Sequence, residues 1–149
     1  MLPLLLVPVI LQALAMAVDE LWFHRRRGLP RWERWGHPID TLGTALCYAW
    51  LLTRSPGSPH ALAGYVALCA VSCLLITKDE LVHAERCEPA EGWLHSVLFV
   101  LHPVVFLCFW LLWSSGAVYL VQGALLLTLG LMLYQLLYWS APWQRTKAE

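Results

Sequence analysis

The chain has 149 residues, of which 59% are hydrophobic and only 13% are charged, and its mean hydropathy is +0.59. This composition lies outside the range of soluble globular domains. Ten acidic and ten basic residues give a formal net charge of zero, which does not indicate a nucleic-acid-binding surface. We therefore expect an integral membrane protein with no nucleic-acid partner.

Apolar runs that approach or exceed the length of a membrane-spanning helix, about 20 residues, occur five times along the chain. Their approximate ranges are 2–23, 38–54, 61–83, 92–113 and 116–139. The runs are continuous rather than alternating, and a backbone in lipid must satisfy its own hydrogen bonds, so we expect helices. The whole chain, residues 1–149, is thus predicted to form one all-α membrane domain with five transmembrane helices.

Basic residues are distributed unequally between the two ends of these predicted helices. One side carries Arg25, Arg26, Arg27, Arg31, Arg34, Arg86, Arg145 and Lys147. The other side carries Arg54 alone. Because cytoplasmic loops are enriched in arginine and lysine, we expect the N-terminus outside the cell membrane and the C-terminus in the cytoplasm. No basic residue precedes the first run, so we expect it to be a retained helix and not a cleaved signal peptide.

Two segments with a common pattern contain most of the side chains that can bind a metal. Each reads Asp-Glu-Leu, then a histidine within four residues of the glutamate, and then Glu-x-Trp-x-His. The segments cover residues 19–40 and 79–102, and they hold nine of the ten carboxylates and five of the six histidines. This clustering predicts a tandem duplication and a shared site at the cytoplasmic boundary.

The duplication predicts two parallel helical hairpins that form a four-helix bundle, with a fifth helix beside it. The two repeats cover about residues 2–54 and 61–113, and the extra helix covers about 116–139. Hairpins of equal orientation are related by a rotation of about 180° around the membrane normal. We expect that rotation to bring Glu20 near Glu80 and His37 opposite His95.

Acidic and imidazole side chains recur three or four residues apart, a spacing that places them on one face of a helix. The pairs are Glu20 with His24, Glu33 with His37, Asp79 and Glu80 with His83, and Glu91 with His95. Asp40 lies one turn beyond His37, and His102 lies two turns beyond His95. The spacing of Glu80 and His83 is similar to the Glu-x-x-His element of di-iron carboxylate bundles.

A mixed set of oxygen and nitrogen ligands suits iron or manganese, and also zinc. We predict two divalent metal ions, with iron favoured over zinc and manganese. The expected inner ligands are Glu20, His24, Glu33, His37, Glu80, His83, Glu91 and His95. Asp40 and His102 are expected to be additional ligands or partners of the ligands, and Asp79 is the alternative to Glu80. Any one pair alone is more often a solvated helix boundary, but ionisable residues gathered within membrane segments are usually functional.

Iron would predict a membrane enzyme that hydroxylates or desaturates a lipid-like substrate with the help of an electron donor. Zinc would instead predict hydrolysis of a lipid headgroup or amide, with a glutamate as the base. A metal-handling or transport protein is a further interpretation, although ligands on one side leave no polar path across the membrane. Haem bound by a pair such as His24 and His83, and a scaffold held by salt bridges, are the remaining alternatives.

Overall fold

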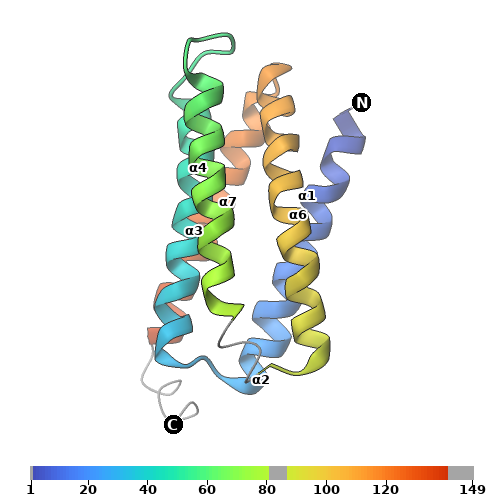
Figure 1. Ribbon diagram of the computed structural model, residues 1–149, viewed down its shortest axis with the longest axis vertical. Coiled ribbons are helices and arrows are strands. Elements are labelled where there is room, and N and C mark those ends of the chain that lie inside the picture. Colours follow the sequence, from blue (N-terminus) through green and yellow to red (C-terminus); the bar gives the residue numbers. More distant parts are fainter. Residues whose placement is uncertain (1, 81–86, 141–149) are drawn as a thin grey trace.

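The computed structural model in Figure 1 describes residues 2–80 and 87–140, apart from the side chain of Asp79, as an all-α protein. Five long helices run roughly along one axis. They are α1 (Leu2–Val18), α3 (Arg31–Leu52), α4 (Ala61–Leu75), α6 (Pro89–Ser114) and α7 (Val118–Ser140). The prediction of an all-α chain is therefore confirmed.

Four helical segments among the described residues are long and apolar enough to cross a membrane. They are Leu2–Arg27, Ala61–Lys78, Pro89–Ser114 and Val118–Ser140. The helix α3 is long, but its N-terminal half carries Arg31, Glu33, Arg34 and Asp40, which lower its hydropathy. The expected span at 38–54 therefore coincides with a helix but not with a segment of membrane-spanning composition, and its crossing of the membrane stays a prediction.

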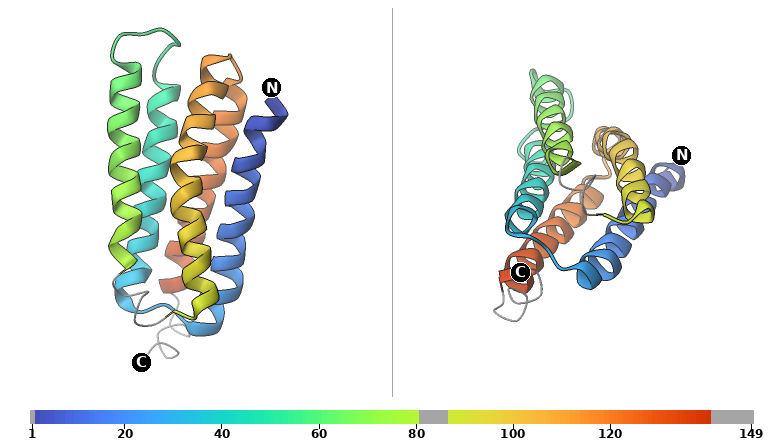
Figure 2. Two further views of the ribbon diagram at one scale, coloured as in Figure 1. Left: turned by 45° about the vertical axis from the view of Figure 1, so that its right-hand side comes forward. Right: turned by 60° about the horizontal axis from the view of Figure 1, so that its bottom comes forward.

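The helices form two groups, which Figure 2 shows from two directions. The helix α1 packs mainly against α6, whereas α3 packs against both α4 and α7. The helix α7 also contacts α6, so it joins the two groups. The expected first hairpin would instead have made α1 and α3 close neighbours. No repeat is apparent in the part of the chain that the structure describes, and the duplication stays a prediction.

The end of the bundle that contains the 53–60 connection is held together by aromatic packing. Tyr48 on α3 lies with its ring centroid 4.6 Å from that of Phe109 on α6. Tyr65 on α4 donates a hydrogen bond of 2.8 Å to the carbonyl of Phe106. These large buried rings close this end of the molecule.

A close approach of α3 and α4 depends on one glycine. A Cβ atom at Gly64 would lie 2.2 Å from Cζ2 of Trp50, so only a residue without a side chain fits there. The indole N–H of Trp50 donates a hydrogen bond of 3.0 Å to the carbonyl of Ala61, which fixes the ring against the start of α4.

At the opposite end, the chain passes from α1 to α3 through a π-helical segment, η1 (Asp19–His24), and one short turn, α2 (Arg25–Arg27). Gly28 then adopts a positive φ of 77°, which a residue with a side chain rarely adopts. Leu29 is buried, and its carbonyl accepts a 2.6 Å hydrogen bond from Nε of Arg34. This tight connection brings the first turn of α3 up against η1.

Two further features position residues at this end. The helix α4 continues as a short 3₁₀ segment, η2 (Ile76–Asp79). The helix α6 begins at Pro89, after an extended Glu88, and a proline suits the first turn because it has no N–H group that needs a partner there. Glu91 and His95 therefore lie in the first two turns of α6, beside η1.

Candidate metal centre

The π-helical segment η1 directs three ionisable side chains inward. Asp19, Glu20 and His24 are all buried, although they lie at the end of an apolar helix. In a π-helix the hydrogen bond runs from residue i to residue i+5, and such wide turns occur often at functional sites. The wide turn places Asp19 on the same side as His24, five residues later, whereas an α-helix would rotate them apart by about 140°.

The first group of ligand atoms comes from Asp19, His24, Glu91 and His95. One nitrogen or carboxylate oxygen from each residue lies within 4.8 Å of the others, and all four residues are buried. Nε2 of His95 lies 3.0 Å from Oδ1 of Asp19 and can donate a hydrogen bond to it. The group thus joins the end of α1 to the first two turns of α6.

His24 is at the centre of the cluster and only 1% exposed. Its Nε2 atom lies 3.3 Å from Oδ2 of Asp19 and 3.8 Å from Oε1 of Glu91. Its Nδ1 atom lies 3.6 Å from Oε2 of Glu20. Neither nitrogen makes a hydrogen bond of good geometry with another described residue. Three carboxylates therefore converge on one buried imidazole, two of them at Nε2 and one at Nδ1.

His24, Glu33 and His37 form a second group, whose ligand atoms also lie within 4.8 Å of one another. The ring centroids of His24 and His37 are 4.7 Å apart, and those of His24 and His95 are 6.3 Å apart. His37 and His95 were expected to face each other, and the structure places both of them around His24.

Arg27 is a member of the cluster that the sequence did not identify. Its guanidinium donates hydrogen bonds of 3.2 and 2.8 Å to the two carboxylate oxygens of Glu33. It donates a third, of 2.9 Å, to Oε1 of Glu91. Glu33 and Glu91 are almost completely buried, so this bidentate contact provides a fixed positive charge between the starts of α3 and α6.

The cluster contains more negative than positive charge. Asp19, Glu20, Glu33 and Glu91 supply four carboxylates, and Arg27 supplies one guanidinium, so three negative charges remain if the histidines are neutral. Carboxylates gathered in a low-dielectric wall repel one another unless protons or cations balance them. A divalent cation fits this donor set, which consists of imidazole nitrogens and carboxylate oxygens.

Glu20 and Asp40 lie beside the cluster with partners of their own. Glu20 accepts a hydrogen bond of 2.5 Å from the indole N–H of Trp139 on α7. Asp40 forms an ion pair of 2.5 Å with Lys78 on η2. Both carboxylates line the cavity described below. The carboxylate of Asp40 therefore links α3 to η2.

His102 lies deeper in the bundle than the expected cluster. Its Nδ1 atom is 3.2 Å from Nε2 of Gln12 on α1, and its Nε2 atom is 3.1 Å from Oγ of Ser72 on α4. Both ring nitrogens therefore bind protein side chains from neighbouring helices. His102 joins three helices and does not belong to either group of ligand atoms.

The second sequence segment is only partly described. Glu80 has an exposed side chain, whereas the side chain of Asp79 and all of His83 lie outside the described residues. Cys87 lies close to Glu91, and the pKa of its thiol is raised to about 12, mainly because the thiol is partly buried, while Arg27 lowers the pKa and Glu91 contributes to raising it. Cys87 belongs to neither group of ligand atoms among the described residues.

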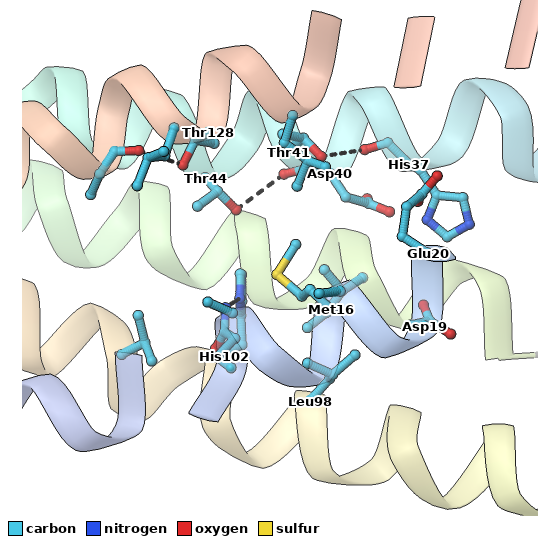
Figure 3. A pocket seen from close by; sticks show the side chains of 18 of the residues that line it. Met16, Asp19, Glu20, His37, Asp40, Thr41, Thr44, Leu98, His102 and Thr128 are labelled. Carbon is cyan, nitrogen blue, oxygen red and sulfur yellow. Dashed lines mark hydrogen bonds between the residues drawn. The ribbon is translucent and has the colours of Figure 1, made fainter. Parts of the chain in front are cut away.

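A mainly apolar cavity of about 480 Å³ extends from the cluster into the bundle. Figure 3 shows Asp19, Glu20 and His37 at one end of it, and His102 and Thr128 farther along. Asp19, Glu20, His37 and His95 belong to its wall, whereas His24, Glu33 and Glu91 lie behind it. The cluster therefore has one side that faces a space large enough for a ligand.

Two members of the site, Asp19 and Arg27, were missed for different reasons. Asp19 was passed over because an α-helical spacing of three or four residues selects Glu20 as the partner of His24. Arg27 was assigned to membrane topology together with its basic neighbours. An acidic pair five and four residues before a histidine was the available signal for Asp19, and no spacing rule pointed to Arg27.

Comparisons of the chain with protein-family models, with curated proteins and with solved structures find no match. What the site defines is a buried carboxylate and histidine cluster that can hold a metal ion, in a helical protein with apolar helices long enough to cross a membrane.

Proposed function

We propose that this protein is a membrane-embedded, metal-dependent oxidoreductase that hydroxylates or desaturates a lipid-like substrate. The observation that carries the proposal is that Asp19 and His95 each take part in two features of the structure. They belong to the four-residue group of ligand atoms and also to the wall of the apolar cavity. A metal ion held there would lie next to a hydrocarbon chain in the cavity.

The donor set supports iron as the metal. Asp19, His24 and His95 provide two imidazoles and one carboxylate, the ligand set of many iron(II) oxygenases, and Glu91 is close enough to be a fourth ligand. Bound iron would supply oxygen activation, with one oxygen atom entering a C–H bond and the other leaving as water. That reaction needs two electrons and two protons, so an electron donor is part of the proposal.

The contacts of Arg27 support a single metal ion in this proposal. The sequence predicted two ions, but both carboxylate oxygens of Glu33 and one of Glu91 accept hydrogen bonds from this guanidinium. A second ion at His24, Glu33 and His37 would have to displace Arg27. We propose that one ion binds on the side of Asp19 and His95, and that Arg27 provides the second positive charge.

The other predicted ligands take different parts in the proposal. Glu20 and His37 face the cavity, where they can move protons to and from the bound substrate. Asp40 is held by Lys78, and His102 by Gln12 and Ser72, so their part is to shape the cavity wall. We still propose Asp79, Glu80 and His83 as metal ligands, on the basis of their spacing in the sequence alone.

Membrane insertion and orientation belong to the same proposal. The four apolar segments cross the membrane together with α3, and the ends of the helices near η1 lie in the cytoplasmic leaflet. Support comes from the placement of Arg25, Arg26, Arg31 and Arg34 at that end, with Arg54 at the other. Trp22, Trp32, Trp35 and Trp93 are exposed near the same end, as expected of side chains at a membrane interface.

A zinc-dependent hydrolase is the second candidate, and the position of Glu20 favours it. A glutamate that lines the cavity beside a site of two histidines and one carboxylate could serve as the general base for a water molecule. The two candidates differ in the metal and in the bond that is broken.

Metal analysis of protein purified without added metal tests both candidates. About one equivalent of iron per chain, lost in an Asp19→Asn, His95→Ala double variant, would support the oxygenase. One equivalent of zinc in place of iron would transfer the proposal to the hydrolase. Wild-type protein that takes up neither metal, even after incubation with iron(II) or zinc, would refute a metal-dependent function.

A further inference from the structure

The cavity beside the cluster has the dimensions of one extended hydrocarbon chain. Along α6 its wall runs from His95 to Phe109, fourteen residues apart, which corresponds to about 21 Å at a rise of about 1.5 Å per residue. Along α3 it runs from His37 to Tyr48, and this distance of eleven residues corresponds to about 17 Å. The wall is therefore slightly longer than one leaflet of a bilayer, about 15 Å.

The length of the wall sets the length of the chain that the cavity can hold. An extended alkyl chain advances about 1.3 Å per carbon, given C–C bonds of about 1.5 Å. A wall of about 17 to 21 Å therefore corresponds to a chain of about 13 to 16 carbons. The cavity volume of about 480 Å³ leaves room for such a chain.

The middle of the cavity offers no hydroxyl that needs a partner from the ligand. Thr44 donates a hydrogen bond to the carbonyl of Asp40, and Thr128 donates one to the carbonyl of Ala124. Thr41 donates to the carbonyl of His37 and to Gln135, and His102 is bound by Gln12 and Ser72. Apart from the amide oxygen of Gln12, which is buried without a hydrogen-bond partner among the described residues, this wall fits a ligand without polar groups along its length.

The two ends of the cavity differ in chemistry. Asp19, Glu20, His37 and His95 line one end, whereas Val105, Phe109 and Tyr48 line the other. Tyr48 and Phe109 pack with ring centroids 4.6 Å apart and belong to the buried aromatic core. These two rings form the apolar end, or floor, of the cavity, and a chain with its polar group at the ionisable end would end there.

From these observations we infer that the cavity binds one straight-chain amphiphile, with its polar end at Asp19 and His95, and that Tyr48 and Phe109 measure its length. The identification of the polar end with a reaction centre rests on the proposed function. The length measurement does not, because it depends only on the wall and floor of the cavity.

Native mass spectrometry with an equimolar mixture of primary alkanols of 10 to 20 carbons tests this inference, since each bound alkanol is recognised by its mass. We expect the wild-type protein to retain chains of about 13 to 16 carbons and to discriminate at least about fivefold against the 20-carbon alkanol, which exceeds the wall length. Phe109→Ala should shift the preferred length upward by two or more carbons. Ala124→Phe, which fills the cavity near the floor, should shift it downward.

Phe99→Ala is the matched control, because Phe99 lies in the wall but not at the floor. It should change the amount of alkanol bound and leave the preferred length unchanged. Equal retention of all chain lengths, or no opposite shifts in Phe109→Ala and Ala124→Phe, would overturn the inference. Wild-type protein that binds no metal but keeps its length preference would count against the proposed function alone.

Discussion

Nε2 of His95 lies 3.0 Å from Oδ1 of Asp19, and this contact joins the first turns of α6 to the π-helical end of α1. The two residues are 76 positions apart in the chain. Since both belong to the same group of four ligand atoms, their contact defines the side of the cluster that faces the cavity.

Asp19→Asn should remove metal from the protein, because the amide keeps the size of the side chain but loses the negative charge that balances a cation. We expect metal affinity to fall at least about tenfold, the lower bound seen when even outer partners of metal ligands are removed. Competition with a coloured chelator measures the affinity. Glu88→Gln, at an exposed position before α6, is the control and should keep the wild-type value. Equal affinities of the two variants would remove Asp19 from the site.

Arg27→Met should lower the free energy of unfolding, because Glu33 and Glu91 would keep their buried negative charges without a partner. The loss expected on breaking a buried ion pair is about 3 kcal/mol. Thermal unfolding in detergent, with and without added divalent metal, measures it. Added metal should restore part of the stability in this variant, since a second cation can then occupy the position of the guanidinium.

Arg26→Met is the matched control for that experiment, because Arg26 is exposed and stacks on Trp22. Its unfolding temperature should change little. If Arg27→Met is as stable as the control and gains nothing from added metal, the cluster does not depend on a fixed cation.

Gly64→Ala should destabilise the contact between α3 and α4, because the added Cβ atom would lie 2.2 Å from the ring of Trp50. Overpacking of this kind costs about 1–3 kcal/mol, which exceeds the gain of about 1 kcal/mol that alanine brings to a helix. Thermal unfolding measures the difference. Gly123→Ala is the control, since a Cβ atom there meets nothing, and its stability should be equal or slightly higher.

The orientation can be checked with single cysteines in a background without the native ones. A cysteine in place of the exposed Ser55 should react with a membrane-impermeant maleimide added to intact cells. A cysteine in place of the exposed Arg31 should react only after the membrane is opened. The reverse pattern would place the cluster at the outer face of the membrane.

Cys87 should react slowly with iodoacetamide at pH 8, because the thiolate is the reactive form and burial raises the thiol pKa to about 12. Relative to a free thiol with a pKa of about 8.5, the rate should be lower by roughly a thousandfold. The thiol pKa is higher in the folded protein than in the unfolded protein. The resulting stabilisation of the fold is fully present at a pH below the unfolded-state pKa and is lost as the pH rises toward 12.

Peptide-level mass spectrometry separates the labelling of Cys87 from that of the other cysteines. Glu91→Gln should accelerate it, because the Glu91 carboxylate raises the thiol pKa. Labelling of wild-type Cys87 at the rate of a free thiol would contradict the buried environment.

The helices were predictable from the sequence because long apolar runs in a chain of this composition leave few alternatives. The start of α3 at Arg31 was not, since its first turns contain Arg31, Glu33 and Arg34, and hydropathy places the span later. The sequence also could not predict which helices pack against each other. Apolar residues surround α1 and α7 on all sides, so no stripe indicates that α1 packs on α6 or that α7 packs on α3.

The type of candidate site could be predicted from the sequence, but not all of the residues that form it. The spacing of acids and histidines predicted a site that includes His24, His37 and His95, and the structure brings the other two rings to within 4.7 and 6.3 Å of His24. It could not include Asp19, whose approach to His24 depends on a π-helical turn. It also could not identify Arg27, because the sequence alone does not show whether an arginine side chain is buried.

The π-helical turn also holds one residue more than an α-helix would need to present the same face. Deleting one residue from η1, such as Leu21, would leave Asp19 four residues before His24, a spacing that an ordinary α-helix keeps on one face. Gln12 would then still face His102, and Val9 and Met16 would stay in the cavity wall. The wide turn thus accommodates an extra residue beside the cluster while α1 keeps the face that lines the cavity.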